Sequence, residues 1–169
     1  MKPIGAFTFV LHSHMPYARL AGRWPHGEEW VHEAICETYL PLLNALYDLA
    51  EEGVQYRLTI GITPILAEQL ADADIIDHFD AFMEEKIAAA RADIPRFRGE
   101  IPPPQAAVNV TAATAAQMGL EEEERRAEVV PTGEANPHMA YLAEWYLAWF
   151  EGIKRSFDAR FGRDLIGAF

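Results

Sequence analysis

The sequence predicts an α/β fold in which parallel strands alternate with helices. Two mostly apolar runs rich in β-forming residues, 4–11 and 55–62, are each followed by a segment with helical periodicity. The first run lacks clean alternation, which is typical of a strand buried on both faces of a parallel sheet. The order strand, loop, helix, strand, loop, helix is the order expected of a parallel α/β sheet or barrel.

The first connection is a long loop followed by a broken helix. Residues 12–29 are polar, aromatic and punctuated by glycine and proline, so they predict an irregular loop. From Trp30 apolar residues recur at steps of three and four until Gly53, which is a stop signal. Pro41 is expected to kink or split this helix because proline removes a backbone donor.

Further helices follow the second predicted strand. A short one begins at Thr63-Pro64, where proline suits the first turn. A second spans 72–92, and a third spans 137–161 before Gly162 stops it. Asp164 is expected to cap the start of a further helix in the last residues of the sequence, 165–169.

Residues 98–136 differ in composition from the rest of the chain. They hold three consecutive prolines, an Ala/Thr/Val tract and four consecutive glutamates, Glu121 to Glu124. Such biased composition with weak periodicity predicts an inserted loop or a partly disordered segment, within which one helix could lie. The four glutamates are interpreted as a solvated face.

Composition limits the classes of partner. The 169 residues carry a net charge of −12, and their basic residues are scattered, which argues against nucleic-acid binding. No apolar run approaches the ~20 residues of a membrane-spanning helix, so no membrane partner is expected. The lone Cys36 cannot form an internal disulfide and is interpreted as structural, so a cytoplasmic location is expected. The negative net charge neither favours nor opposes binding of a neutral substrate such as a sugar.

His12 and His14 directly follow the first predicted strand and are the clearest candidates for chemistry. In an extended chain residues i and i+2 project to the same face, so both imidazoles can enter one site. In barrels the carboxyl ends of the strands hold the active site. Leu11 and Met15 flank the pair and are expected to draw it inward. The alternative is that both are ordinary polar loop residues.

A metal site is a weaker interpretation of the same pair. A catalytic zinc usually takes three protein ligands. The other histidines fall in a loop or in helices, and none follows the second predicted strand: His26, His32, His78 and His138. A metal-dependent hydrolase built on His12 and His14 would need ligands from outside this chain.

Trp24 and Trp30 lie in the polar, glycine-containing stretch 22–30. Flat aromatic faces stack on sugar rings and the indole N–H donates a hydrogen bond, so such a loop suits saccharide recognition. Trp30 could equally be packed at the start of the helix. Glu28 and Glu29 are interpreted as ordinary partners of the helix dipole.

An aromatic stripe at helical spacing occurs in the third helical segment. Its members are expected to face the core, as amphipathic helices do. They are Trp145, Tyr146, Trp149 and Phe150.

Several motifs together resemble family 57 of the glycoside hydrolases, and within it the 1,4-α-glucan branching enzymes. They are HSHMPY (12–17), GRWPHGEEW (22–30), ETYLPLL (37–43), GITPILAEQL (61–70) and DLIGAF (164–169). The resemblance covers roughly 4–95 and 137–169. Segment 98–136 departs from it, being longer and more biased than the usual connection.

The resemblance implies the N-terminal portion of a (β/α)7 TIM-like barrel, truncated after about two strands and their helices. Residues 1–169 would then be the N-terminal part of a catalytic domain. The alternative is a small α+β domain that ends with a C-terminal helix. The family retains anomeric configuration with a glutamate nucleophile and an aspartate acid/base. No position here matches either motif, so both are expected beyond Phe169.

The resemblance also implies the roles of the candidate residues. His12 and His14 would line the donor sugar subsite, and Trp24 and Trp30 match loop tryptophans near that cleft. The implied function is branching of α-1,4-glucan in glycogen biosynthesis, without cofactor or metal, and this chain alone would be inactive. A non-catalytic glucan- or partner-binding fragment is the alternative, and the oligomeric state stays open.

Overall fold

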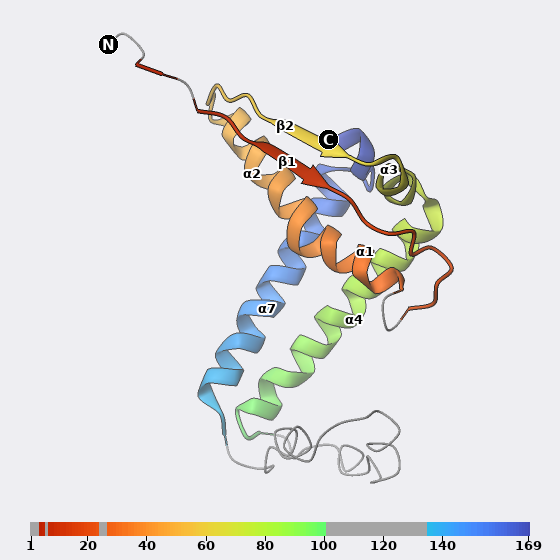
Figure 1. Ribbon diagram of the computed structural model, residues 1–169. Coiled ribbons are helices and arrows are strands. Elements are labelled where there is room, and N and C mark those ends of the chain that lie inside the picture. The colour runs from red at the N-terminus through yellow and green to blue at the C-terminus, as the bar shows by residue number, and fades with distance from the viewer. Residues whose placement is uncertain (1–3, 6, 24–26, 101–134) are drawn as a thin grey trace, which may run out of the picture. The chain divides into compact units, whose positions relative to one another are not determined.

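The computed structural model describes residues 4–5, 7–23, 27–100 and 135–169. The chain divides into two compact units, Met1–Lys86 with Trp149–Phe169, and Ile87–Ala148. Most of the described residues are helical, and the strands form one small sheet (Figure 1). No helix within these described ranges is long and apolar enough to cross a membrane.

The sheet consists of two parallel strands, β1 (Val10–Ser13) and β2 (Thr59–Ile62). Val10 is in register with Thr59 and His12 with Gly61. The predicted parallel pairing is therefore confirmed, although both strands are shorter than the runs 4–11 and 55–62.

The prediction that the first strand is buried on both faces is wrong. Val10 and His12 are exposed, whereas Leu11 and Ser13 are half-buried. Within the described residues β1 pairs only with β2, and the two strands run side by side with α2 (Leu40–Glu51) beneath them (Figure 1). One face of β1 therefore turns toward the helices while the other stays at the surface.

The helical segment after the first loop is split, as Pro41 predicts. Helix α1 (Glu28–Ala34) passes into a π-helical turn, η1 (Ile35–Tyr39), and then into α2. Pro41 has no N–H to donate and its ring clashes with the carbonyl four residues earlier, so the regular α-helical ladder cannot run through it. The run ends at Gly53, whose φ of +78° is in the left-handed region that glycine favours.

Helices α3 (Pro64–Ala71) and α4 (Ala73–Phe97) follow β2. Asp72 separates them, and its Oδ1 accepts hydrogen bonds from the backbone N–H groups of Asp74 (3.0 Å) and Ile75 (3.2 Å). The side chain thereby satisfies two of the backbone donors that have no partner within the first turn of a helix. Helix α4 continues five residues past its predicted end at residue 92.

The C-terminal elements are α7 (Pro137–Arg155), the π-helical turn η3 (Ser156–Arg160) and α8 (Leu165–Ala168). Gly162 ends the long run with a φ of +58°, as predicted. Asp164 caps α8 by accepting a hydrogen bond from the N–H of Gly167 at 2.8 Å. The predicted insertion 98–136 lies outside the described residues except at its two ends.

The core of the first unit is formed by apolar faces of its helices. Phe79 of α4 and Phe157 of η3 lie edge to face, with ring centroids 4.9 Å apart. The prediction that the aromatic stripe of α7 is core is half wrong: Trp145 and Tyr146 are 46% and 47% exposed, whereas Trp149 and Phe150 pack against the core. The fully buried side chains include Val31, Ile35, Leu40, Leu43, Leu66, Leu70, Ile75, Met83 and Leu165.

The second unit contains the C-terminal end of α4 and the N-terminal part of α7. Among the residues described on these two helices, the buried side chains of this unit are small or apolar: Ile87, Ala90, Ala140 and Ala143. The carbonyl of Phe97 accepts a hydrogen bond from the N–H of Asn136 (2.7 Å), and Arg98 pairs with Glu144 (2.5 Å).

Replacing Phe157 by alanine is expected to lower the free energy of unfolding by about 3–5 kcal/mol, because a fully buried ring is lost and a cavity is left. Urea denaturation followed by circular dichroism measures this. The control is Phe7→Ala, which removes a ring that is 88% exposed and should change stability by less than about 0.5 kcal/mol. Equal effects of the two substitutions would contradict the described core.

Candidate functional site

His12 and His14 lie side by side at the carboxyl end of β1. Their ring centroids are 5.3 Å apart with an interplanar angle of 33°, and both side chains are exposed. A Cβ at Gly61 would lie 3.5 Å from His12 Nδ1, an ordinary van der Waals contact, so the His12 ring lies close to the residue opposite it on β2. Two exposed imidazole rings therefore lie next to each other at this end of the strand.

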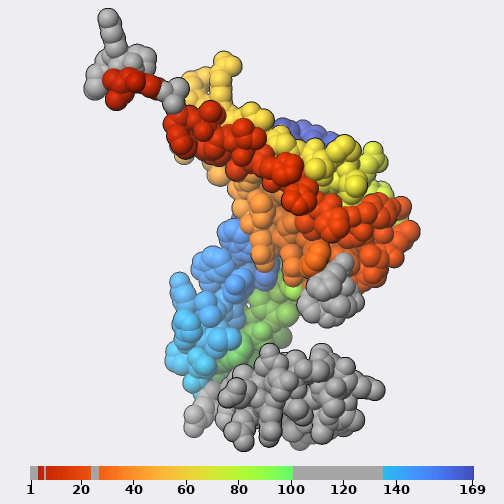
Figure 2. All heavy atoms as spheres, viewed as in Figure 1, coloured from red at the N-terminus to blue at the C-terminus, as the bar shows by residue number. Residues whose placement is uncertain are grey.

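The expectation that Leu11 and Met15 draw the histidines inward is wrong. Leu11 and Met15 are half-buried, and Met15 packs against the core. Side chains alternate across an extended chain, so turning residues 11, 13 and 15 toward the helices turns 12 and 14 away from them. Residues of the first strand and of the loop after it lie at the surface in Figure 2.

The inward face of β1 is attached to the helix beneath it through Ser13. Its side chain is near enough to the hydroxyl of the buried Tyr39 of η1 to lower the pKa of that group slightly. Burial has the larger effect and raises the pKa of the Tyr39 hydroxyl above its ordinary value. The backbone N–H of Thr63 donates to the carbonyl of Ser13 at 3.1 Å, which continues the pairing of β1 and β2 to the start of α3.

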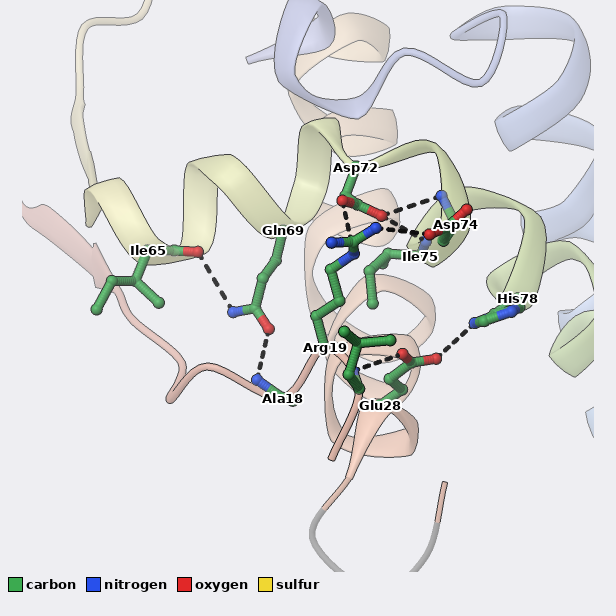
Figure 3. A network of polar contacts seen from close by, with 10 residues as sticks. Ala18, Arg19, Glu28, Ile65, Gln69, Asp72, Asp74, Ile75 and His78 are labelled. Atoms are coloured by element: carbon green, nitrogen blue, oxygen red, sulfur yellow. Dashed lines mark hydrogen bonds and ion pairs between the residues drawn. The ribbon is translucent and has the colours of Figure 1, made fainter. Parts of the chain in front are cut away.

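The loop after β1 is held by a buried amide. Gln69 of α3 is 1% exposed, and its Oε1 accepts a hydrogen bond from the N–H of Ala18 at 2.7 Å (Figure 3). Its Nε2 donates to the carbonyls of Pro16 (3.1 Å) and Ile65 (3.3 Å). One side chain thus fixes the loop to the helix that follows β2.

An ion pair network fixes the next part of the loop. Arg19 contacts Asp72 at 2.8 Å and Asp74 at 2.6 Å (Figure 3). Exposed ion pairs contribute about 0–1 kcal/mol each, so this network adds orientation more than stability. Arg23 makes a two-pronged contact with Glu85 of α4.

Glu28 has a structural role that its interpretation as a dipole partner missed. It is 8% exposed, and its Oε1 accepts a hydrogen bond from the N–H of Leu20 at 3.1 Å. Its Oε2 lies 2.6 Å from Nδ1 of His78 (Figure 3). Leu20 has a φ of +64°, a left-handed conformation that is strained for a residue with a side chain, and Glu28 holds it there. Glu28 therefore connects the loop to α4.

The structure does not place the two predicted tryptophans, Trp24 and Trp30, next to the histidines. Trp30 lies in α1 and is 39% exposed. It is two positions from both Glu28 and His32, so it projects from roughly the opposite side of the helix to these two buried residues. Trp24 lies outside the described residues. The described site therefore unites His12 with His14, and the roles of Trp24 and Trp30 stay predictions.

His32 is buried between aromatic rings of α4. It is 3% exposed, and its ring centroid lies 6.1 Å from Phe79 and 5.5 Å from Phe82. Within the described ranges neither ring nitrogen makes a hydrogen bond, although the backbone of Ile75 is near enough to favour the protonated ring slightly. Burial lowers the pKa of His32 from 6.5 to about 4, so the ring is neutral at pH 7. His32 also lines an open cavity of about 440 Å³ between the loop, α1 and α4.

Metal and thiol chemistry have little support among the described residues. In that part of the chain no three His, Cys, Asp or Glu side chains are grouped so that they could hold a metal ion. Burial raises the pKa of the Cys36 thiol to about 11, so it is not a nucleophilic thiolate at neutral pH.

Comparison by sequence finds relatives that process glucans. The 1,4-alpha-glucan branching enzyme of Thermococcus kodakarensis is 50% identical over 90 residues, which are 53% of this chain and 13% of that enzyme. Two Mycobacterium tuberculosis proteins named as probable 1,4-alpha-glucan branching enzymes are 47% identical over 68 residues, 40% of this chain and 13% of theirs. The matched region is thus a small part of these curated relatives. No protein-family model matches the chain.

Comparison by structure finds the same kind of enzyme. The GH57-type branching enzyme of Pyrococcus horikoshii superposes with a TM-score of 0.70 and 30% identity, over 96% of this chain and 23% of that one. The GH57 branching enzyme of Thermococcus kodakaraensis, solved with glucose, gives 0.66 and 32%, over 95% and 22%. The alpha-amylase AmyC of Thermotoga maritima, 24% identical with a TM-score of 0.62 over 96% and 24%, shows a likeness of fold alone.

The buried neutral His32 is expected to make stability fall with acid. Its pKa is about 4 when folded and 6.5 when unfolded, so the unfolded chain binds more protons between these values. The contribution of the neutral His32 ring to the free energy of unfolding is complete above pH 6.5 and is lost as pH falls toward 4, by about 3 kcal/mol. Urea denaturation from pH 4 to 7 measures it.

Comparison of variants isolates this contribution from other titrating groups. His32→Phe should flatten the pH dependence relative to the unsubstituted protein. His138→Phe, at an exposed histidine, should leave the dependence unchanged. If the His32 and His138 variants follow the same pH curve, His32 is not buried in its neutral form.

Proposed function

This chain is related to the branching enzymes of glycoside hydrolase family 57, as its motifs predict, and we propose that it forms part of an α-glucan-processing enzyme. In the proposed enzyme these residues form the N-terminal part of a (β/α)7 barrel. The proposed reaction is the branching of α-1,4-glucan by retaining glycosyl transfer, with a place in glycogen biosynthesis. A cytoplasmic location stays a prediction from sequence.

The observation that carries the proposal is the exposed pair of imidazoles at the end of β1. Neutral imidazole offers one N–H donor and one acceptor nitrogen, so two adjacent rings offer several hydrogen bonds to the hydroxyls of a sugar. The rings lie at the carboxyl end of a parallel strand, where active sites of such barrels form. His12 and His14 would therefore bind and orient a glucosyl unit.

The proposal assigns binding, not bond cleavage, to these residues. Retaining transfer needs two carboxyl groups about 5–5.5 Å apart, one to attack and one to protonate the leaving oxygen. No residue from 1 to 169 matches the motif of either group. Glu28, the most buried carboxylate near the loop, is already engaged by Leu20 and His78. Trp24 and Trp30 are proposed to add stacking surface for the glucan.

Two other functions make different demands on the same pair. A non-catalytic glucan-binding protein would bind the same sugars through His12 and His14 without transferring them. A metal-dependent hydrolase would need a third ligand near them. Stoichiometric zinc that is lost on His12→Ala would favour the hydrolase over the branching enzyme.

Single substitutions His12→Ala and His14→Ala are each expected to weaken binding of maltoheptaose about tenfold, the loss expected when one or two hydrogen bonds to a sugar are removed. Isothermal titration calorimetry measures the affinity, and circular dichroism checks that each variant is folded. The matched control is His138→Ala, at an exposed histidine of α7, with an expected change below about twofold. Equal affinities for all three variants would contradict the proposal.

A further inference from the structure

The position of His14 depends on a loop that has no regular secondary structure of its own. Strand β1 ends at Ser13, so His14 is the first residue beyond its ladder. A side chain at such a place keeps one direction only if the backbone after it is fixed, because loops are otherwise the mobile part of a fold. The fixing contacts begin two residues later, at the carbonyl of Pro16.

Gln69 makes these contacts from a helix that is itself tied to β1. The N–H of Thr63, the residue before α3, donates to the carbonyl of Ser13 at 3.1 Å. Gln69 lies further along α3 and bonds to the loop at Pro16 and Ala18. The short segment 14–17 is therefore held on both sides: at Ser13 by the residue before α3, and at Ala18 by Gln69 within α3.

The chemistry of the side chain fits this task closely. Holding the loop requires an acceptor for the N–H of Ala18 and a donor for the carbonyl of Pro16, and a primary amide carries both. Its helix neighbours Leu66 and Leu70 are buried apolar residues. An apolar side chain at position 69 would continue their surface but would leave both loop groups without their partner, which is costly above all at the buried N–H of Ala18.

We propose that Gln69 is a positioning residue for sugar binding: through the loop it keeps the imidazole of His14 beside that of His12. This inference rests on the proposed function for its ligand. Gln69 itself does not touch the sugar, since its amide is buried and its polar atoms contact the loop and α3.

The test compares Gln69→Leu with Leu66→Ala, a fully buried residue one turn earlier in the same helix. Leu66→Ala should lower Tm at least as much, because it leaves a cavity, yet its maltoheptaose affinity should stay within twofold when measured well below Tm. Gln69→Leu should weaken the affinity about tenfold under the same conditions. Equal losses from both variants, or no loss from Gln69→Leu, would overturn the positioning role.

A conservative variant adds a readout that simple destabilisation would not move. In Gln69→Glu the protonated carboxyl can both accept from Ala18 and donate to Pro16, whereas the ionised form can only accept. The maltoheptaose affinity of Gln69→Glu is divided by that of the unsubstituted protein at the same pH. This ratio should rise as pH falls, because the carboxyl becomes protonated. A ratio that does not change with pH would count against the role.

A ligand-free measurement separates this inference from the proposed function. Gln69→Leu should move the ring NMR signals of His14 and speed hydrogen exchange at the N–H of Ala18, while Leu66→Ala should leave the His14 ring signals in place. If the unsubstituted chain binds no maltoheptaose but these signals respond as described, the glucan proposal fails and the positioning of His14 stands. If maltoheptaose binds to the unsubstituted chain and the ring signals of His14 do not move in Gln69→Leu, only the positioning role fails.

Discussion

The alternation of side chains across β1 is the constraint on which the described site depends. Leu11, Ser13 and Met15 turn toward the helices. Because side chains alternate across an extended chain, His12 and His14 must then lie on the opposite face of β1, which is exposed to solvent. A shift of one residue in the pairing of β1 with β2 would bury the imidazoles and expose the apolar side chains. The register of His12 with Gly61 therefore sets both the packing of the strand and the position of the two rings.

The contacts around the sheet extend this constraint into the loop that follows. The bond from Thr63 to Ser13 links the ends of the two strands, and Gln69 links α3 to the loop. Further along, Glu28 holds Leu20 in its strained conformation and contacts His78. Successive parts of one irregular segment are thus attached to α3, α1 and α4, which explains how a loop without a ladder can present side chains in fixed directions.

Local chain chemistry predicted much of the fold. Pro41, Gly53, Gly162 and Asp164 mark breaks and caps that depend on the residue itself and its immediate neighbours, and the structure has each of them. The parallel pairing of the strands followed from their separation by a helix. The resemblance to the family 57 branching enzymes was also readable from the motifs, and relatives found by both comparisons support it.

Features that depend on distant partners could not be predicted from local patterns. Gln69 and Glu28 are buried by the loop that packs against them, which is distant in sequence from Gln69. The residues next to Gln69 and Glu28 in the sequence therefore do not indicate that either side chain is buried. Helical spacing also suggested a buried Trp145, although spacing reports a shared face and not what covers it. The inward direction expected of the histidines failed because flanking apolar residues in a strand occupy the opposite face.

The most direct measurement of the central claim is the side-chain NMR spectrum of the six histidines during titration with a maltooligosaccharide. The account expects the ring signals of His12 and His14 to shift together along one binding curve, while those of the buried His32 and the exposed His138 stay in place. Binding that leaves the signals of His12 and His14 unmoved would show that the open face of β1 is not where the glucan lies.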